Sequence, residues 1–200
     1  MINAILCLMG PGGVGKLTIG RLVAERLGCR LVDNHYWLNP IFGLIEQDGV
    51  TPLPKIVWPL VEQVREAVFK TIATVSPPDW GFVFTHQVTA ADNDRTLTDA
   101  IASLAAHRKA HLLGVRLICG PEELVRRVTH PERRLQMKDA DPDAARAKAV
   151  MPPFDPGWPN LLTIDTTGIS AEQSAGLLVR HVKEVFPSPW AAHSDLHTDG

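Results

Sequence analysis

The chain has 200 residues, and its 20 lysines and arginines against 22 aspartates and glutamates give a formal net charge of −2. This length suits one domain with a single core. The near-neutral charge argues against a nucleic-acid partner, and an apolar fraction of 45% excludes a disordered chain. No apolar run reaches the ~18 residues that a membrane span needs. The first residues lack a basic segment and a cleavage site, so we expect neither a signal peptide nor a membrane partner.

The three cysteines, Cys7, Cys29 and Cys119, lie in or beside apolar runs and show no CxxC spacing. They are typical of buried small residues in a reducing compartment, not of disulfides or a metal site. We therefore expect a cytoplasmic protein.

Short apolar runs alternate with helical patterns along the chain. We predict strands at 2–9, 30–33, 81–85, 112–119 and 161–165. We predict helices at 16–27, 60–75, 94–107, 121–128 and 171–185, the last capped by Ser170 and Gln173. Such alternation predicts an α/β fold: a three-layer sandwich with a five-stranded parallel sheet and helices on both faces.

The strongest chemical signal is a GxxxxGK motif between the first strand and the first helix. Its glycines let backbone N–H groups point inward around an anion, and the helix N-terminus adds its dipole. Lys16 supplies a charge for the β- and γ-phosphates of a nucleotide. The predicted phosphate-binding residues are Gly10, Pro11, Gly12, Gly13, Val14, Gly15, Lys16, Leu17 and Thr18.

One position departs from the motif, because Leu17 stands where a serine or threonine normally binds Mg²⁺. Thr18 follows one place later, about 100° further around the helix, so it does not simply replace that ligand. Mg²⁺ keeps several waters and needs few protein ligands. We expect it to bind mainly through nucleotide phosphates and water, with a carboxylate helping.

The stretch Gly10–Gly28, GPGGVGKLTIGRLVAERLG, resembles the start of shikimate-kinase-like small-molecule P-loop kinases. The run from Leu161 to Thr167 resembles the adenine-side strand and loop of those kinases. The resemblance implies a P-loop kinase fold, ATP and Mg²⁺ as cofactors, and Thr167 near the nucleotide. It also implies that Asp33 faces the acceptor and helps to hold Mg²⁺. The glycine triplet of true shikimate kinases is missing after the third strand, so shikimate is not the expected substrate.

Asp33 follows the second strand at the sheet edge where open α/β folds bind ligands. A carboxylate there can accept a hydroxyl proton or orient a hydrated Mg²⁺, and the alternative is that Asp33 or Asn34 caps the next helix. His35, two residues on, and His86, at the end of the third strand, are candidate acceptor-binding residues. Structural roles remain open for both histidines.

A basic cluster follows the fourth strand and comprises Arg126, Arg127, Arg133, Arg134 and Lys138. In small-molecule kinases a lid occupies this place, and its arginines neutralise the transferring phosphoryl group. We assign residues 129–157 to a candidate lid, Arg133 and Arg134 to catalysis, and Arg126 to the nucleotide. Glu122–Arg126 and Glu123–Arg127 pairs on a solvated helix face are the alternative for the first two arginines.

Residues 34–59 form a candidate acceptor-binding insert, in which Pro52 and Pro54 should interrupt any helix. A hydrophobic flap packed on the core is the alternative. We expect the kinase-like domain to cover residues 1–186 and a flexible tail to cover 187–200.

Two functions fit this sequence. The first is a kinase that moves the γ-phosphate of ATP to a hydroxyl of a small molecule, using Lys16, Asp33, Arg133 and Arg134. The second is a nucleotide-binding switch or NTPase with little phosphotransfer, which Leu17 favours. The acceptor and the choice between a monomer and a homodimer stay open.

Overall fold

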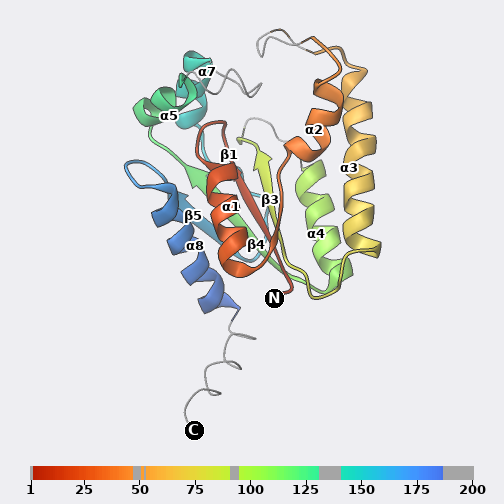
Figure 1. Cartoon of the computed structure of the whole chain (residues 1–200). Helices are drawn as coiled ribbons and strands as arrows, with labels where there is room; N and C mark the ends of the chain where they lie inside the picture. The colour runs from red at the N-terminus through yellow and green to blue at the C-terminus, as the bar shows by residue number, and fades with distance from the viewer. Residues whose placement is uncertain (1, 47–50, 52, 91–94, 131–140, 187–200) are drawn as a thin grey trace.

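Five parallel strands form the centre of the molecule in the computed structural model, which describes residues 2–46, 51, 53–90, 95–130 and 141–186 (Figure 1). The strands stand in the order β2-β3-β1-β4-β5, and every adjacent pair is parallel. Their bounds are β1 Ala4–Gly10, β2 Arg30–Val32, β3 Phe82–Gln87, β4 His111–Ile118 and β5 Leu161–Asp165. The predicted five-stranded parallel sheet is confirmed.

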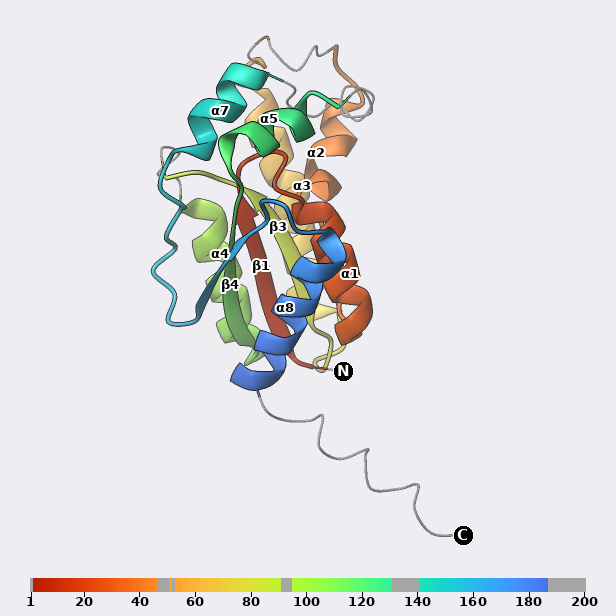
Figure 2. The same ribbon diagram turned by 90° about the vertical axis from the view of Figure 1, so that its left-hand side faces the viewer.

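Helices cover both faces of this sheet, as the sequence predicts. On one face lie α1 (Lys16–Leu27) and α8 (Ala171–Val185), and on the other lie α3 (Val57–Thr74) and α4 (Thr96–Arg108) (Figures 1 and 2). Among the described residues, three shorter helices lie at the carboxyl end of the strands: α2 (His35–Phe42), α5 (Pro121–Val128) and α7 (Pro142–Ala149). Ligands of open α/β sheets bind at this end.

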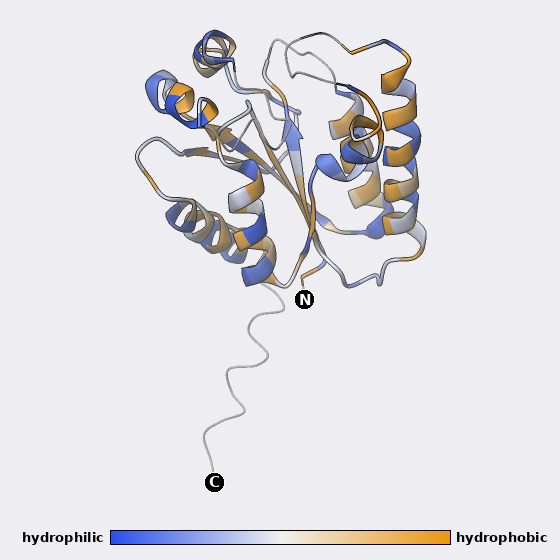
Figure 3. Ribbon diagram, turned by 45° about the horizontal axis from the view of Figure 1, so that its top comes forward, coloured by the Kyte–Doolittle hydropathy of each residue, from blue (hydrophilic) through white to orange (hydrophobic). Residues whose placement is uncertain are grey.

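Strand β1 divides the hydrophobic core into two halves because successive side chains point to opposite faces. Leu6 and Leu8 pack in the half beneath α1 and α8, whereas Ile5 and Cys7 pack in the half beneath α3 and α4. All seven residues of β1 are buried, and the apolar colour of the central strands continues onto the helix faces turned toward them (Figure 3). A central parallel strand therefore reads as an uninterrupted apolar run.

Two helices were not predicted from the sequence. Pro40 lies inside α2, where it removes one backbone hydrogen bond and hides the helical pattern. Helix α2 is held by tertiary packing, because buried Trp37 meets Phe69 of α3 edge-on with ring centroids 6.2 Å apart. Helix α7 begins at Pro142 after an Asp141 cap and buries only Ala145, so it shows almost no apolar stripe.

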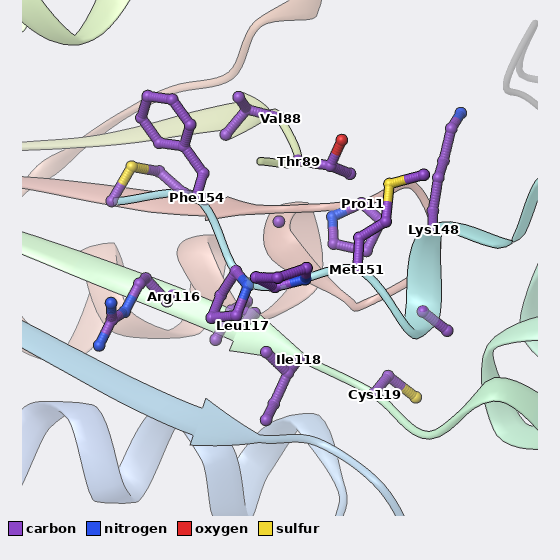
Figure 4. A pocket seen from close by; sticks show the side chains of 15 residues that line it. Pro11, Val88, Thr89, Arg116, Leu117, Ile118, Cys119, Lys148, Met151 and Phe154 are labelled. Atoms are coloured by element: carbon purple, nitrogen blue, oxygen red, sulfur yellow. The ribbon is translucent and has the colours of Figure 1, made fainter. Parts of the chain in front are cut away.

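The connection from α7 to β5 packs against the start of the P-loop and against the end of β4. Figure 4 shows Met151 and Phe154 of this connection facing Pro11, Val88 and the end of β4. The space between them is about 20 Å³, which holds roughly one water molecule. We interpret this space as a narrow gap between packed side chains that hold the P-loop in place.

The three cysteines are free and buried, as predicted. Burial raises the pKa of the Cys29 thiol to about 11, so this group is not poised for reaction at neutral pH. Among the helices of the described residues, none combines the length and the apolar character that a membrane span requires. The expected tail, 187–200, lies outside the described residues.

Phe154 tests whether the connection from α7 to β5 stabilises the fold. This side chain is 6% exposed and meets the His86 ring edge-on. Phe154→Ala should lower the free energy of unfolding by about 3 kcal/mol because it leaves a cavity, measured by denaturant unfolding. Leu44→Ala, at an 83% exposed position, should change it by less than about 0.5 kcal/mol. Equal effects of the two substitutions would show that Phe154 does not support the core.

Candidate functional site

The P-loop, residues 10–16, leaves β1 through Gly10, where the backbone has no room for a side chain. Gly10 has a φ of 149°, and a Cβ there would collide with the Leu117 carbonyl oxygen of β4. Gly13 has a φ of 95°, and its Cβ would lie 2.7 Å from Cγ1 of Val128 in α5. These two glycines therefore do more than expose backbone N–H groups. They let the loop pack directly against β4 and α5.

Lys16 is the first residue of α1, and its side chain folds back along the P-loop. Its Nζ donates to the backbone oxygens of Gly10 at 2.7 Å and Pro11 at 2.8 Å. The ammonium group is thus held beside the N-terminus of α1, where the helix dipole also favours an anion. This arrangement provides the charge and the N–H groups that a nucleotide's phosphates require.

A cleft of about 400 Å³ opens on one side of the P-loop. Its floor is the P-loop with the start of α1, and its walls come from the ends of β2 and β3 and from α2 and α3. The side chains that line it include Lys16, Thr18, Asp33, His35, Phe42, Trp58 and Gln87. The proposed insert thus supplies one wall of a cleft next to the phosphate-binding loop.

Asp33 is held at the bottom of this cleft by three hydrogen bonds. Its Oδ1 accepts from the His35 backbone N–H at 3.1 Å and pairs with His35 Nδ1 at 2.5 Å. Its Oδ2 accepts from the Thr85 hydroxyl at 2.7 Å. Burial alone would raise the pKa of the Asp33 carboxyl, but the bonds from His35 and Thr85 outweigh it and lower that pKa. Asp33 is therefore an ionised group that orients the His35 ring.

A second cleft of about 390 Å³ lies on the other side of the P-loop. Gly13, Gly15 and Thr18 line both clefts, so the loop forms the partition between them. The outer wall of the second cleft contains Arg127 of α5 and Thr166, which follows β5. The site is therefore a phosphate-binding loop with one cleft on each side.

Several solved structures with this architecture are described as kinases. A protein from Chloroflexus aurantiacus J-10-fl, described provisionally as a kinase, is 19% identical and has a TM-score of 0.65, over 92% of this chain and 98% of that chain. A gluconokinase from Sinorhizobium meliloti 1021 is 17% identical with a TM-score of 0.58, over 94% and 99% of the two chains. A shikimate kinase from Acinetobacter baumannii is 17% identical with a TM-score of 0.53, over 92% and 94%.

This chain has the P-loop kinase fold. The resemblance to shikimate-kinase-like enzymes therefore holds at the level of the fold.

The similarity to curated sequences covers a smaller part of the chain than the similarity to solved structures. A stretch of 104 residues is 30% identical to a bifunctional pantoate ligase/cytidylate kinase from Prochlorococcus marinus strain MIT 9303. The match covers 52% of this chain and 21% of that protein, so the chain spans only a part of its curated relative. No protein-family model matches the chain.

The two adjacent arginines of α5 occupy different places in the P-loop kinase fold. Arg126, assigned to the nucleotide from the sequence, pairs with Glu123 at 2.7 Å and has a 73% exposed side chain. Arg127 lines the second cleft instead, and its Nη2 donates to the Thr166 carbonyl at 2.8 Å. The hydrogen bonds from both arginines lower the pKa of Glu123 to about 2. The helical spacing of α5 would have separated the two arginines, because neighbours point about 100° apart.

Thr167, the other residue assigned to the nucleotide side, lies beside the second cleft. Its hydroxyl accepts from the Gly120 backbone N–H at 2.7 Å and donates to Asp165. It lines a shallow surface with Arg126, whereas its neighbour Thr166 lines the cleft itself. Thr167 therefore joins the loop after β5 to the start of α5.

His86 does not lie in the first cleft. Residues alternate along β3, and Thr85 and Gln87 point toward the P-loop, where both line the cleft. His86 points to the opposite face and meets Phe154 with ring centroids 6.5 Å apart. Gln87, which sequence reasoning did not assign to the site, takes the place expected of His86. The period of two in a strand could have indicated this once the side of Asp33 was known.

Arg133 and Arg134 lie outside the described residues, so their lid role stays a prediction. The described end of the candidate lid contains α7, whose Arg146 pairs with Glu122 of α5 at 3.5 Å. This contact places α7, in the second half of the candidate lid, next to α5, the helix that precedes the candidate lid.

The donor set near Lys16 suits a Mg²⁺ ion held mostly by phosphates and water. Leu17 lines the cleft with an apolar side chain, while the hydroxyl-bearing Thr18 lines both clefts. Asp33 keeps lone pairs beyond its three hydrogen bonds, which allows a contact through water. Bound there with a nucleotide, Mg²⁺ would neutralise phosphate charge.

Asp33→Asn tests the ionised state of this carboxyl. The pKa of Asp33 is lowered in the folded chain, so its stabilisation is present above the unfolded value of about 3.9 and is lost as the pH falls through the folded value. At pH 7 the variant should unfold with a free energy lower by about 1–3 kcal/mol. The difference should shrink below about pH 4 in denaturant titrations. A pH-independent difference would contradict an ionised Asp33.

The neighbouring arginines form a matched pair for nucleotide binding. Arg127→Ala removes the side chain that lines the second cleft, so it should weaken binding of an ATP analogue about tenfold, measured by calorimetry. Arg126→Ala removes an exposed side chain of the same type and should weaken it less than about twofold. Thermal unfolding of both variants reports folding. A larger loss in Arg126→Ala would place the nucleotide on the outer surface of α5.

Proposed function

We propose that this protein transfers the γ-phosphate of ATP to a hydroxyl group of a small molecule. The observation that carries the proposal is the P-loop that separates two clefts and contributes Gly13, Gly15 and Thr18 to both. A phosphoryl group held at the loop is thereby accessible from the acceptor side. Phosphoryl transfer depends mostly on such positioning and on charge stabilisation.

The nucleotide occupies the second cleft in this proposal, with its phosphates on the P-loop. The backbone N–H groups of the loop donate to phosphate oxygens. Lys16 Nζ exchanges its contacts with the Gly10 and Pro11 carbonyl oxygens for contacts with phosphate oxygens. Arg127, tied to Glu123 and to Thr166, forms the wall beside the base and ribose. Arg133 and Arg134 keep their predicted role of closing over the transferring group.

The acceptor occupies the first cleft, where His35 and Asp33 act as a unit. Asp33 has three donors on its carboxylate and fixes the His35 ring through Nδ1. The opposite ring nitrogen is then directed away from Asp33, which suits a hydrogen bond with the acceptor hydroxyl. As the hydroxyl oxygen bonds to the γ-phosphorus and gives its proton to that ring nitrogen, the bond to the β,γ-bridging oxygen breaks and ADP leaves.

A nucleotide-dependent switch or NTPase is the second candidate, and Leu17 is the observation that favours it. An apolar side chain at this position removes one Mg²⁺ ligand and would slow transfer more than binding. The two functions differ in their response to an acceptor. Only a kinase should release ADP faster when a suitable hydroxyl compound is added.

An acceptor screen by ADP release separates the two functions. The wild type should show stimulation by at least one hydroxyl compound. Lys16→Ala should abolish it, with a fall in turnover of about a hundredfold or more because the phosphate charge is no longer neutralised. Lys55→Ala, at an exposed lysine that does not line the cleft, serves as the matched control and should leave turnover unchanged. A wild type that no acceptor stimulates above the Lys16→Ala background would contradict the kinase proposal.

A further inference from the structure

The acceptor cleft has an unusual charge balance for a fold that handles phosphates. Among the described residues that line it, Lys16 is the only lysine or arginine, and Lys16 belongs to the P-loop. Besides Asp33 and His35, the polar side chains on the acceptor side are the amides Asn34, Asn39 and Gln87 and the hydroxyl of Thr85. Amides and hydroxyls recognise neutral hydroxyl groups, whereas carboxylates and phosphates are bound by arginine or lysine.

The sequence of the insert points the same way. Residues 34–59 contain one basic residue, Lys55, and two acidic residues, Glu46 and Asp48. Lys55 is exposed and does not line the cleft. Asp33 adds a buried carboxyl group at the floor of the cleft. In the described part of the acceptor half, an anionic acceptor would therefore meet one carboxyl group and no lysine or arginine.

Aromatic side chains form the outer wall of the cleft. Trp58, at the start of α3, is 52% exposed although it is one of the largest apolar side chains. It meets Phe42 of α2 edge-on, with ring centroids 6.2 Å apart, and both rings line the cleft. An exposed tryptophan beside polar amides is a favourable surface for a ring with one apolar face.

We propose that the acceptor is an uncharged ring compound with a free hydroxyl, such as a neutral sugar or nucleoside, that packs on Trp58 and Phe42. This inference rests on the proposed phosphotransfer. It separates this chain from the similar proteins whose names specify gluconate, shikimate or cytidylate, all of which are anions. The same fold would then receive its acceptor through shape and amide hydrogen bonds instead of charge.

Pairs of compounds that differ in charge test the proposal on the full chain with a non-hydrolysable ATP analogue bound. The pairs are thymidine and thymidylate, methyl shikimate and shikimate, and glucose and gluconate. Calorimetry or ligand-observed NMR should show that the neutral member binds in at least one pair, with about tenfold or greater preference over its anion.

Three variants locate the preference in the cleft. Trp58→Ala should weaken binding of the preferred neutral compound about fivefold to tenfold. Tyr36→Ala, which removes an aromatic ring of matching exposure outside the cleft, should weaken it less than about twofold. Asn39→Arg places a cation on the exposed cleft side of α2 and should raise affinity for the anionic members.

The possible results are distinguishable. Preference for the anions in the wild type, binding of no member of the panel, or equal effects of Trp58→Ala and Tyr36→Ala would each overturn the uncharged acceptor. Binding of neutral members that never stimulates ADP release from ATP would contradict the proposed phosphotransfer instead, while the preference of the cleft would stand.

Discussion

The close approach of the P-loop to β4 and α5 determines the shape of the site. Gly10 lies against the Leu117 carbonyl, and Gly13 lies against Val128, so the loop has no space for side chains at these points. The loop is thereby held as a thin partition with a cleft on each side. A bulkier loop would move away from β4 and α5 and would disturb both clefts together.

Helices and strands that are specified by local sequence patterns were predicted correctly. Helix α1, helix α5 and strand β5 have the predicted bounds, because caps, proline at a first turn and apolar periodicity specify them locally. Helices α2 and α7 were missed because their stability comes from packing and capping that leave little periodicity. Trp37 packs on Phe69, which is 32 positions away in the printed sequence, and such distant contacts are not visible in a local pattern.

In the candidate site as well, residues specified by local sequence patterns were predicted, and residues placed by tertiary contacts were not. The P-loop and Asp33 were predicted because a motif and the end of a buried strand place them at the ligand edge of the sheet. The three donors to Asp33 could not be predicted, since Thr85 comes from β3 and reaches Asp33 only through the register of β2 and β3. Arg127, not Arg126, lines the second cleft, and Gln87, not His86, lines the first. These placements have a similar origin, because each depends on which way a helix or strand faces.

If the two clefts hold donor and acceptor on either side of one loop, radiolabelled γ-phosphate from ATP should reach the preferred neutral compound. The label should appear in an acid-stable ester of that compound, and Lys16→Ala should abolish this product. Label found only in inorganic phosphate would contradict this arrangement of donor and acceptor, because the P-loop would then present the phosphoryl group to water alone.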